Sequence, residues 1–311
     1  MVQLGPHRRS PASHPRPRPD GSKQNHHTNA SNLESGLYVV ATPIGNLGDV
    51  TYRAIDILRR ADVIACEDTR VTGRLMKRYG LMTALISYHD HNAARVRPRL
   101  LSRLTKGEAV AIVSDAGTPV ISDPGYRLIK DTAEAGHRII PVPGASALLA
   151  GIMTSGLPSD RIFFAGFLPQ RSPARRRTIS ELRSVQATLV FFESSRRLTS
   201  ALKDMADILG PRAVTIGREL TKIHEQTYRG HLDTVAHEIA SIGPIKGEVV
   251  VVVEAGNVGK VLDRKELDAS LTTALSSMSV RDAVATIAKN GQWPRSLVYE
   301  RALALKANQP L

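Results

Sequence analysis

The sequence has little cysteine and no long apolar run. Cys66 is the only cysteine among 311 residues, which excludes an internal disulfide and a cysteine-rich metal cluster and indicates a reducing, cytoplasmic compartment. The longest uncharged apolar stretch, residues 139–159, is interrupted by prolines and glycines, so it cannot present the continuous apolar face that a membrane span needs. Residues 1–36 lack the apolar core of a secretory signal. We therefore expect a protein without a membrane anchor.

Three common nucleotide and metal motifs are absent as well. No two of the 23 glycines stand two residues apart, so G-x-G-x-x-G does not occur, and neither a Walker A motif nor H-E-x-x-H is present. These absences remove the usual support for dinucleotide-dependent redox chemistry, P-loop nucleotide hydrolysis and a zincin site.

The net charge of +13 is distributed unevenly. Residues 170–203 carry eight Lys/Arg against two Asp/Glu, while residues 1–36 and 260–311 each carry an excess of three. A confined basic stretch indicates a polyanionic partner such as RNA, although charge alone supports a solubilising surface equally well. The planar guanidinium group suits phosphate, and the arginines predicted to contact RNA in this stretch are Arg171, Arg175, Arg176 and Arg177.

Four segments differ in pattern. Residues 1–36 are rich in proline and poor in apolar side chains, which predicts a disordered basic tail. Residues 37–156 and 157–259 alternate short apolar runs with helix-like segments, typical of two α/β domains with partly parallel sheets. The predicted strands include 37–42, 63–66, 109–114, 138–141, 162–165, 188–193, 213–218 and 248–254. Residues 260–311 contain helical patterns at 267–277, 280–289 and 295–306, with a turn at 290–294 that resembles a helical hairpin.

Glycine, proline and small polar residues gather directly after predicted strands. Residues 42–49 follow the first strand, residues 114–119 and 122–125 follow the third, and residues 141–147 follow the next. A helix is expected to start at Asp123-Pro124 and to stop at Gly136. In α/β sheets, ligands bind outside the carboxyl ends of the strands, where small residues let the backbone approach. Several such clusters predict a composite small-molecule pocket.

Acidic and polar clusters also follow strands. The sequences E-D-T-R at 67–70, H-D-H-N at 89–92 and R-E-L-T-K at 218–222 each come after an apolar run. His89 and His91 lack a matched third ligand, so no metal site is predicted. Solvated loop residues are one interpretation, and substrate contact or proton handling is the favoured one.

The ordered motifs over residues 37–256 resemble the tetrapyrrole-methylase superfamily. They are T-P-I-G-N-L, E-D-T-R, H-D-H-N, S-D-A-G-T-P-V-I-S-D-P-G, P-G-A-S-A, G-F-L-P, F-E-S and R-E-L-T-K. The similarity is to the ribosomal RNA branch, which 2′-O-methylates a cytidine in 16S rRNA of the small ribosomal subunit. The resemblance implies two α/β domains of the tetrapyrrole-methylase type with a small C-terminal helical, helix-turn-helix-like extension. It also implies S-adenosylmethionine as cofactor and a homodimer. The cofactor contacts it implies are Asp115, Ala116, Gly117, Ile121, Ala145, Ser146, Phe192, Glu193, Leu220 and Gly247.

Methyl transfer to a ribose hydroxyl needs alignment and a proton acceptor. The candidate acceptors are Glu67, Asp68, His89 and Glu219, with Asp68 and Glu219 ranked first. Arg70, Arg218 and Lys222 are expected to hold RNA. Arg196 and Gln226 depart from the family pattern of histidine and an acid, so neither receives a catalytic role.

Two rival functions remain on the sequence alone. A methyltransferase acting on a tetrapyrrole would need a large apolar cleft and no RNA, and the basic stretch argues against it. A non-catalytic RNA-binding protein would not need the cofactor loops.

Overall fold

The computed structural model describes residues 33–121, 125–243, 245–256, 264–289, 293 and 295–307. The predicted disordered tail therefore lies almost entirely outside the described residues, as do Asp123 and Pro124, where a helix start is predicted. No helix in the described part of the chain has the length and apolar character to cross a membrane.

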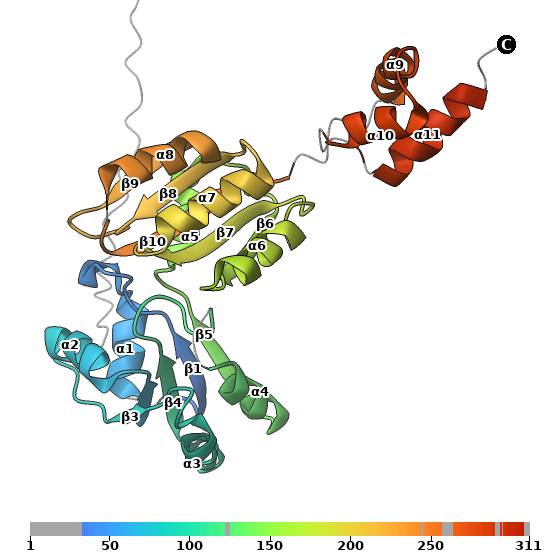
Figure 1. The fold of residues 1–311 in the computed structure, drawn as a ribbon. Helices are drawn as coiled ribbons and strands as arrows, with labels where there is room; N and C mark the ends of the chain where they lie inside the picture. Colours follow the sequence, from blue (N-terminus) through green and yellow to red (C-terminus); the bar gives the residue numbers. More distant parts are fainter. Residues whose placement is uncertain are drawn as a thin grey trace, which may run out of the picture. The chain divides into compact units, whose positions relative to one another are not determined.

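The first sheet is entirely parallel, with strand order β3-β2-β4-β1-β5 (Figure 1). Its strands are β1 (Gly36–Val40), β2 (Val63–Cys66), β3 (Leu85–Ser87), β4 (Ala109–Val113) and β5 (Ile139–Val142). The connecting elements are the short 3-10 helix η1 (Leu47–Asp49) and the helices α1 (Tyr52–Arg60), α2 (Thr69–Tyr79), α3 (Ala93–Thr105) and α4 (Tyr126–Glu134). The alternation of apolar runs and helices along the sequence predicts the α/β class correctly, and the strands predicted from the sequence do not include β3.

Helices cover both faces of this sheet. Side chains of α1 and α2 form one apolar cluster with Tyr38 and Val40 of β1, and side chains of α3 and α4 form another with Leu37 and Val39 of the same strand. Successive strand residues point to opposite faces, so a strand that is apolar at every position needs a helix layer on each side.

Helix boundaries follow local hydrogen bonding. The Thr51 hydroxyl accepts from the N–H of Ala54 at the start of α1, and the Asp68 carboxylate accepts from the N–H of Arg70 at the start of α2. The latter cap places the start of α2 at Thr69. Gly136 has φ +74° just beyond α4, which confirms the predicted stop.

The second sheet is mixed, with strand order β6-β7-β10-β8-β9. Only β6 and β7 pair in parallel, and the other pairs are antiparallel. The strands are β6 (Ile162–Phe167), β7 (Thr188–Ser194), β8 (Ala213–Arg218), β9 (Gln226–His231) and β10 (Glu248–Val253). The predictions include all of these strands except β9, whose polar, exposed sequence at the sheet edge carries no strong apolar signal.

Helices also lie on both faces of the second sheet. They are α5 (Ala147–Ser155), α6 (Ser172–Glu181), α7 (Leu198–Leu209) and α8 (Leu232–Ile242). Side chains of α6, α7 and α8 pack with Val249, Val251 and Val253, whereas α5 packs with Val250 and Val252. The valine run 249–253 of β10 is therefore buried on both faces of the sheet. The sequence places α5 with the N-terminal domain, and its packing partners belong to the second sheet.

Three C-terminal helices share a separate apolar cluster. They are α9 (Arg264–Leu275), α10 (Val280–Lys289) and α11 (Arg295–Ala307), close to the predicted ranges. Leu267, Val284 and Val298 are among the buried side chains of this cluster. Arg301 of α11 binds both carboxylate oxygens of Asp268 of α9 at 2.6 Å, so an ion pair joins the first and last of these helices.

We expect the packing of α5 on β10 to require glycine at position 151. A Cβ at Gly151 would lie 2.6 Å from Cγ1 of Val250, inside a buried strand. The Gly151→Ala variant should therefore lose about 1–3 kcal/mol of unfolding free energy through overpacking, measured by urea denaturation. Gly73→Ala in α2 is the matched control, because nothing lies within 4 Å of its added Cβ. That control should gain about 1 kcal/mol from helix propensity. Equal effects of the two substitutions would contradict the packing requirement.

Candidate functional site

A cavity of about 380 Å³ is lined by residues that follow the strands of both sheets. Most of its wall comes from the loop after β4, the turn before α5 and the ends of β6, β7 and β8, together with the start of β10. The lining residues are Ile44, Glu67, Asp115, Ala116, Gly117, Thr118, Ile121, Ser146, Ala147, Phe167, Phe192, Glu193, Gly217, Leu220, Glu248, Val249 and Val250. In α/β sheets, ligands bind at the carboxyl ends of the parallel strands.

The structure brings most of the predicted cofactor residues to this cavity. Those that line it are Asp115, Ala116, Gly117, Ile121, Ser146, Phe192, Glu193 and Leu220. Ala145 and Gly247 do not line it and stand next to residues that do. The predicted site omits Phe167 and Val250 among others. The G-F-L-P motif carries a signal for Phe167, whereas nothing in the valine run distinguishes Val250.

Backbone hydrogen bonds hold the glycine-rich loops against one another. Thr42 and Gly117 exchange both N–H···O bonds at 2.9 and 3.0 Å, and the Thr118 hydroxyl donates to the carbonyl of Ala145 at 3.2 Å. Gly117 has φ +78°, and a Cβ there would lie 3.1 Å from the Ile44 side chain. Position 117 therefore requires glycine for its conformation and for the close approach of the loops.

Strained backbone flanks the cavity. Among the described residues, the non-glycine positions with positive φ are Val120, Glu219 and Thr221. They are the sequence neighbours of the lining residues Ile121 and Leu220. Such conformations cost roughly 1–3 kcal/mol each and gather at ligand-binding sites, so the surrounding loops hold these residues in place.

The cavity is acidic in a basic protein. Among the described lining residues, four are carboxylic acids, namely Glu67, Asp115, Glu193 and Glu248, and none is Lys or Arg. The whole chain has a net charge of +13. This cavity therefore favours a cationic ligand, opposite in sign to the partner that the exposed arginines favour.

Glu193 is the most buried of these acids. Its Oε1 accepts from the N–H of Ser194 at 2.7 Å and pairs with Nη2 of Arg197 at 2.6 Å. Its Oε2 is buried without a partner in the described structure. Burial raises the pKa of Glu193, while the Ser194 hydrogen bond and the charges of Arg197 and Arg175 oppose that rise. A buried acceptor without a partner is costly, so a donor from a ligand would stabilise it.

The structure separates the four candidate proton acceptors. Glu67 lines the cavity, and Asp68, His89 and Glu219 do not. The carboxylate of Asp68 binds Arg70, whose hydrogen bonds lower the Asp68 pKa to about 2.

Glu219 and His89 are held by other contacts. Glu219 accepts from Nζ of Lys222 at 2.8 Å and from the N–H of Glu248 at 2.9 Å, and these bonds, the first above all, lower its pKa. The backbone N–H of His89 donates to Asn92, and its buried Nδ1 has no partner in the described structure. The two acids ranked first from the sequence therefore have structural partners and poorly suit proton abstraction.

The predicted RNA contacts near the strand ends also have partners. Arg218 donates to the carbonyl of Lys246 and to the side chain of Gln226, both at 2.6 Å. Lys222 pairs with Glu219 and Glu248, and its aliphatic stem packs against Gly45. Arg70 binds Asp68 and keeps an exposed side chain.

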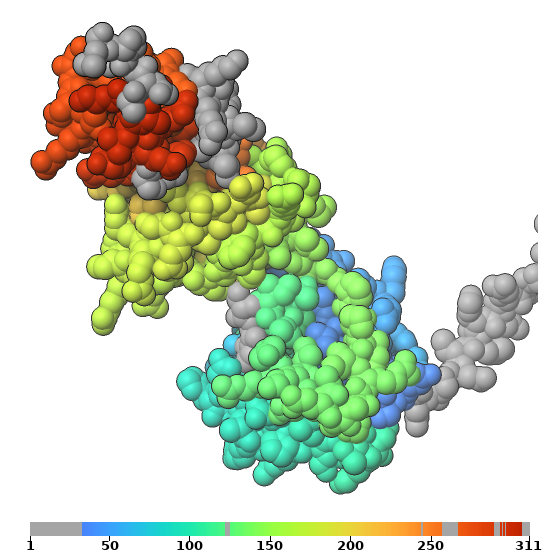
Figure 2. All heavy atoms as spheres, turned by 90° about the vertical axis from the view of Figure 1, so that its right-hand side faces the viewer, coloured from blue at the N-terminus to red at the C-terminus, as the bar shows by residue number. Residues whose placement is uncertain are grey.

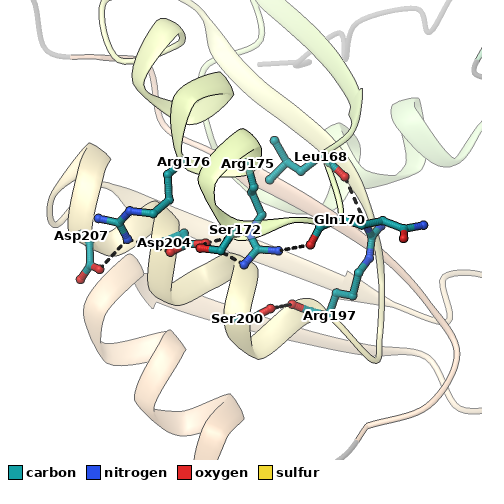
Figure 3. Close-up of polar contacts among 9 residues, drawn as sticks. All are labelled: Leu168, Gln170, Ser172, Arg175, Arg176, Arg197, Ser200, Asp204 and Asp207. Carbon is teal, nitrogen blue, oxygen red and sulfur yellow. Dashed lines mark hydrogen bonds and ion pairs between the residues drawn. The ribbon is translucent and has the colours of Figure 1, made fainter.

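The basic stretch does not present four open guanidinium groups (Figure 3). Arg175 is buried and paired with Asp204, and Arg176 binds both Asp204 and Asp207. The sequence predicts RNA contact at all four arginines, and the structure pairs Arg175 and Arg176 with carboxylates of α7. Arg171 and Arg177 remain exposed.

Comparison with known proteins agrees with this geometry. Residues 36–236 match the family model of Tetrapyrrole (Corrin/Porphyrin) Methylases, and residues 262–306 match the RsmI C-terminal HTH domain. A ribosomal RNA small subunit methyltransferase I from Mesorhizobium japonicum is 45% identical over 88% of this chain and 93% of its own length. The protein of that name from Halalkalibacterium halodurans is 48% identical over 72% of this chain and 77% of its own length.

A solved structure supports the fold independently. Diphthine synthase aligns with 70% of this chain and 89% of its own, at a TM-score of 0.56 and 16% identity. With this fold and these relatives, the chain belongs to the tetrapyrrole methylases and, within them, to the family of ribosomal RNA small subunit methyltransferase I.

Proposed function

We propose that this protein transfers a methyl group from S-adenosylmethionine to the ribose 2′-oxygen of a cytidine in 16S ribosomal RNA of the small subunit. The observation that carries the proposal is the acidic cavity, whose wall contains most of the cofactor residues implied by the family motifs. The family membership supplies the substrate class.

The residues of the cavity fit this cofactor. S-adenosylmethionine carries a permanent sulfonium charge and an ammonium group, which the carboxylates of Asp115, Glu193 and Glu248 would stabilise. Apolar side chains such as Ile121, Phe192 and Leu220 provide the surface that an adenine ring needs. The cofactor supplies the activated methyl group, and the protein supplies binding and orientation.

Glu67 is the acid best placed to accept the ribose proton. It lines the cavity, whereas Asp68, His89 and Glu219 do not. A carboxylate beside the reacting oxygen can take the proton as the new C–O bond forms. We therefore assign proton handling to Glu67 in place of Asp68 and Glu219.

The RNA surface of the second sheet would use the exposed arginines around α6. Arg171, Arg177 and Arg196 are exposed, and Nε of Arg177 lies 4.0 Å from the Glu181 carboxylate. Figure 2 shows this part of the chain in yellow-green. Open guanidinium groups can bind phosphate without breaking an internal ion pair.

We also propose that the protein forms a homodimer and works in the cytoplasm. A homodimer is supported by apolar side chains left exposed on α5 and on the edge strand β6, including Leu149, Met153 and Phe163. Ribosomal RNA as substrate supports a cytoplasmic location.

We predict that Asp115→Asn weakens the binding of S-adenosylmethionine more than that of S-adenosylhomocysteine. The amide keeps the Oδ1 acceptor for the N–H of Asp68, now 3.0 Å away, and removes only the charge. The loss should be about tenfold for the sulfonium and smaller for the uncharged thioether, measured by titration calorimetry.

The exposed Asp160→Asn is the charge-matched control and should bind both ligands as the wild type does. Equal losses of affinity for the two ligands in Asp115→Asn would show that this carboxylate does not interact with the sulfonium charge. No binding of either ligand by the wild type would refute the enzymatic proposal.

We predict that Glu67→Gln slows single-turnover methyl transfer by about 100-fold or more while calorimetric cofactor affinity changes little. The measurement is transfer of labelled methyl to small ribosomal subunits that lack the modification, compared with naked RNA. Glu219→Gln should mainly lower stability, because it disturbs contacts with Lys222 and the N–H of Glu248. A normal rate in Glu67→Gln together with a slow step in stably folded Glu219→Gln would reverse the assignment.

We predict that the double variant Arg171→Gln, Arg177→Gln binds ribosomal RNA more weakly and with a flatter salt dependence. Each lost phosphate contact should reduce the slope of log K against log salt by about one. The control is Arg53→Gln, Arg59→Gln, two exposed arginines of α1 with the same charge change. Identical slopes in the two double variants would argue against phosphate contacts on α6.

A further inference from the structure

Arg175 lies in a buried ion-pair network that joins α6, α7 and the segment after β6 (Figure 3). Its Nε and Nη2 both lie 2.7 Å from Oδ2 of Asp204, and its Nη1 donates to the carbonyl of Gln170 at 3.1 Å. The residue is 4% exposed. Because all three guanidinium nitrogens have partners inside the protein, none is available to an external phosphate.

Asp204 is shared between several donors from α6. The Ser172 hydroxyl donates to its Oδ2 at 3.2 Å, and Arg176 contacts its Oδ1 at 2.7 Å. Burial alone would raise the Asp204 pKa, and the hydrogen bonds from Arg176 and Arg175 outweigh it, so the pKa lies below its ordinary value. Asp204 therefore stays ionised and anchors the first turns of α6 to α7.

The segment 168–171 leads from the cavity wall to this network. Phe167, the last residue of β6, lines the cavity, and its ring centre lies 5.7 Å from that of Phe192, another lining residue. The carbonyl of Gln170 accepts from Arg175, and the carbonyl of Leu168 accepts from Arg197 at 3.2 Å. Two guanidinium groups thus supply partners to a stretch between a strand and a helix, and they fix its path directly after Phe167.

The same two arginines influence the buried acid of the cavity. Arg197 pairs with Oε1 of Glu193, and the charges of both Arg197 and Arg175 favour the ionised form of Glu193 against its burial. Arg175 therefore reaches the cavity through the backbone next to Phe167, and its charge partly opposes the rise that burial causes in the Glu193 pKa.

We propose that Arg175 is a positioning residue for the S-adenosylmethionine site. Paired with Asp204, it holds the chain after Phe167 and thereby sets one wall of the cavity. It does not contact RNA, although it belongs to the most basic stretch of the sequence. This inference rests on the proposed function, since it concerns the affinity of the same cavity for its cofactor.

The planar fork explains why arginine is needed. A lysine at position 175 keeps the charge and can pair with Asp204, but a single ammonium group does not reproduce the simultaneous contacts with Asp204 and Gln170. Replacing a buried ion pair by apolar residues of similar volume is often neutral for stability. The pair Arg175→Met, Asp204→Leu can therefore remove the positioning contacts while the fold survives.

The test is calorimetric titration of the full-length protein with S-adenosylmethionine, together with thermal unfolding of each variant. The double variant Arg175→Met, Asp204→Leu should bind the cofactor about tenfold more weakly, with an unfolding temperature near that of the wild type. Arg175→Lys should show an intermediate affinity. Lys203→Met, an exposed substitution next to Asp204 on α7, is the control and should bind as the wild type does.

Each remaining outcome overturns the inference in a recognisable way. Wild-type affinity in the folded double variant contradicts a positioning role, and should that variant unfold, wild-type affinity in Arg175→Lys contradicts it equally. A salt slope of RNA binding that falls by about one in the double variant would assign Arg175 to phosphate instead. Failure of the wild type to bind S-adenosylmethionine would refute the proposed function itself, and the inference with it.

Discussion

The close packing of α5 against β10 is the contact on which the cavity depends. Gly151 lets the helix approach Val250, which itself lines the cavity. The same helix begins at Ala147, and the side chain of its N-cap residue Ser146 accepts a hydrogen bond from its first turn. Both residues also line the cavity. Helix α5 packs on the second sheet and directly follows the turn after β5 of the first sheet, so its packing also positions that turn. Without that approach, the walls contributed by the two sheets would not enclose one volume.

Negative charge is concentrated in the cavity wall, whereas the protein as a whole is positively charged. The protein is strongly basic overall, yet the residues described along the cavity wall include four carboxylates and no Lys or Arg. A cationic cofactor and a polyanionic RNA make opposite electrostatic demands. Part of the positive charge stabilises the fold and does not serve to bind RNA. Arg175, Lys222 and Arg218 each have partners inside the protein.

The sequence predicted the loops of the site better than its side-chain chemistry. The turns at Gly117 and Ser146 could be located because small residues after strands have a direct backbone reason, and both line the cavity. The ranking of Asp68 and Glu219 as proton acceptors could not be judged from sequence. Their partners include neighbours along the chain, Arg70 and Lys222, and whether such neighbours turn toward the acid is a matter of side-chain conformation.

Local residue patterns by themselves determined the α/β class, the position of most strands and the clustering of the cofactor loops, because strand periodicity and turn chemistry act over a few residues. Tertiary structure alone decided which charged side chains are available to an external partner. Arg175 and Arg177 are indistinguishable as sequence, being two positions apart in one basic run. Only the packing of α6 on α7 turns the first toward Asp204 and leaves the second exposed, because residues two apart on a helix face different directions.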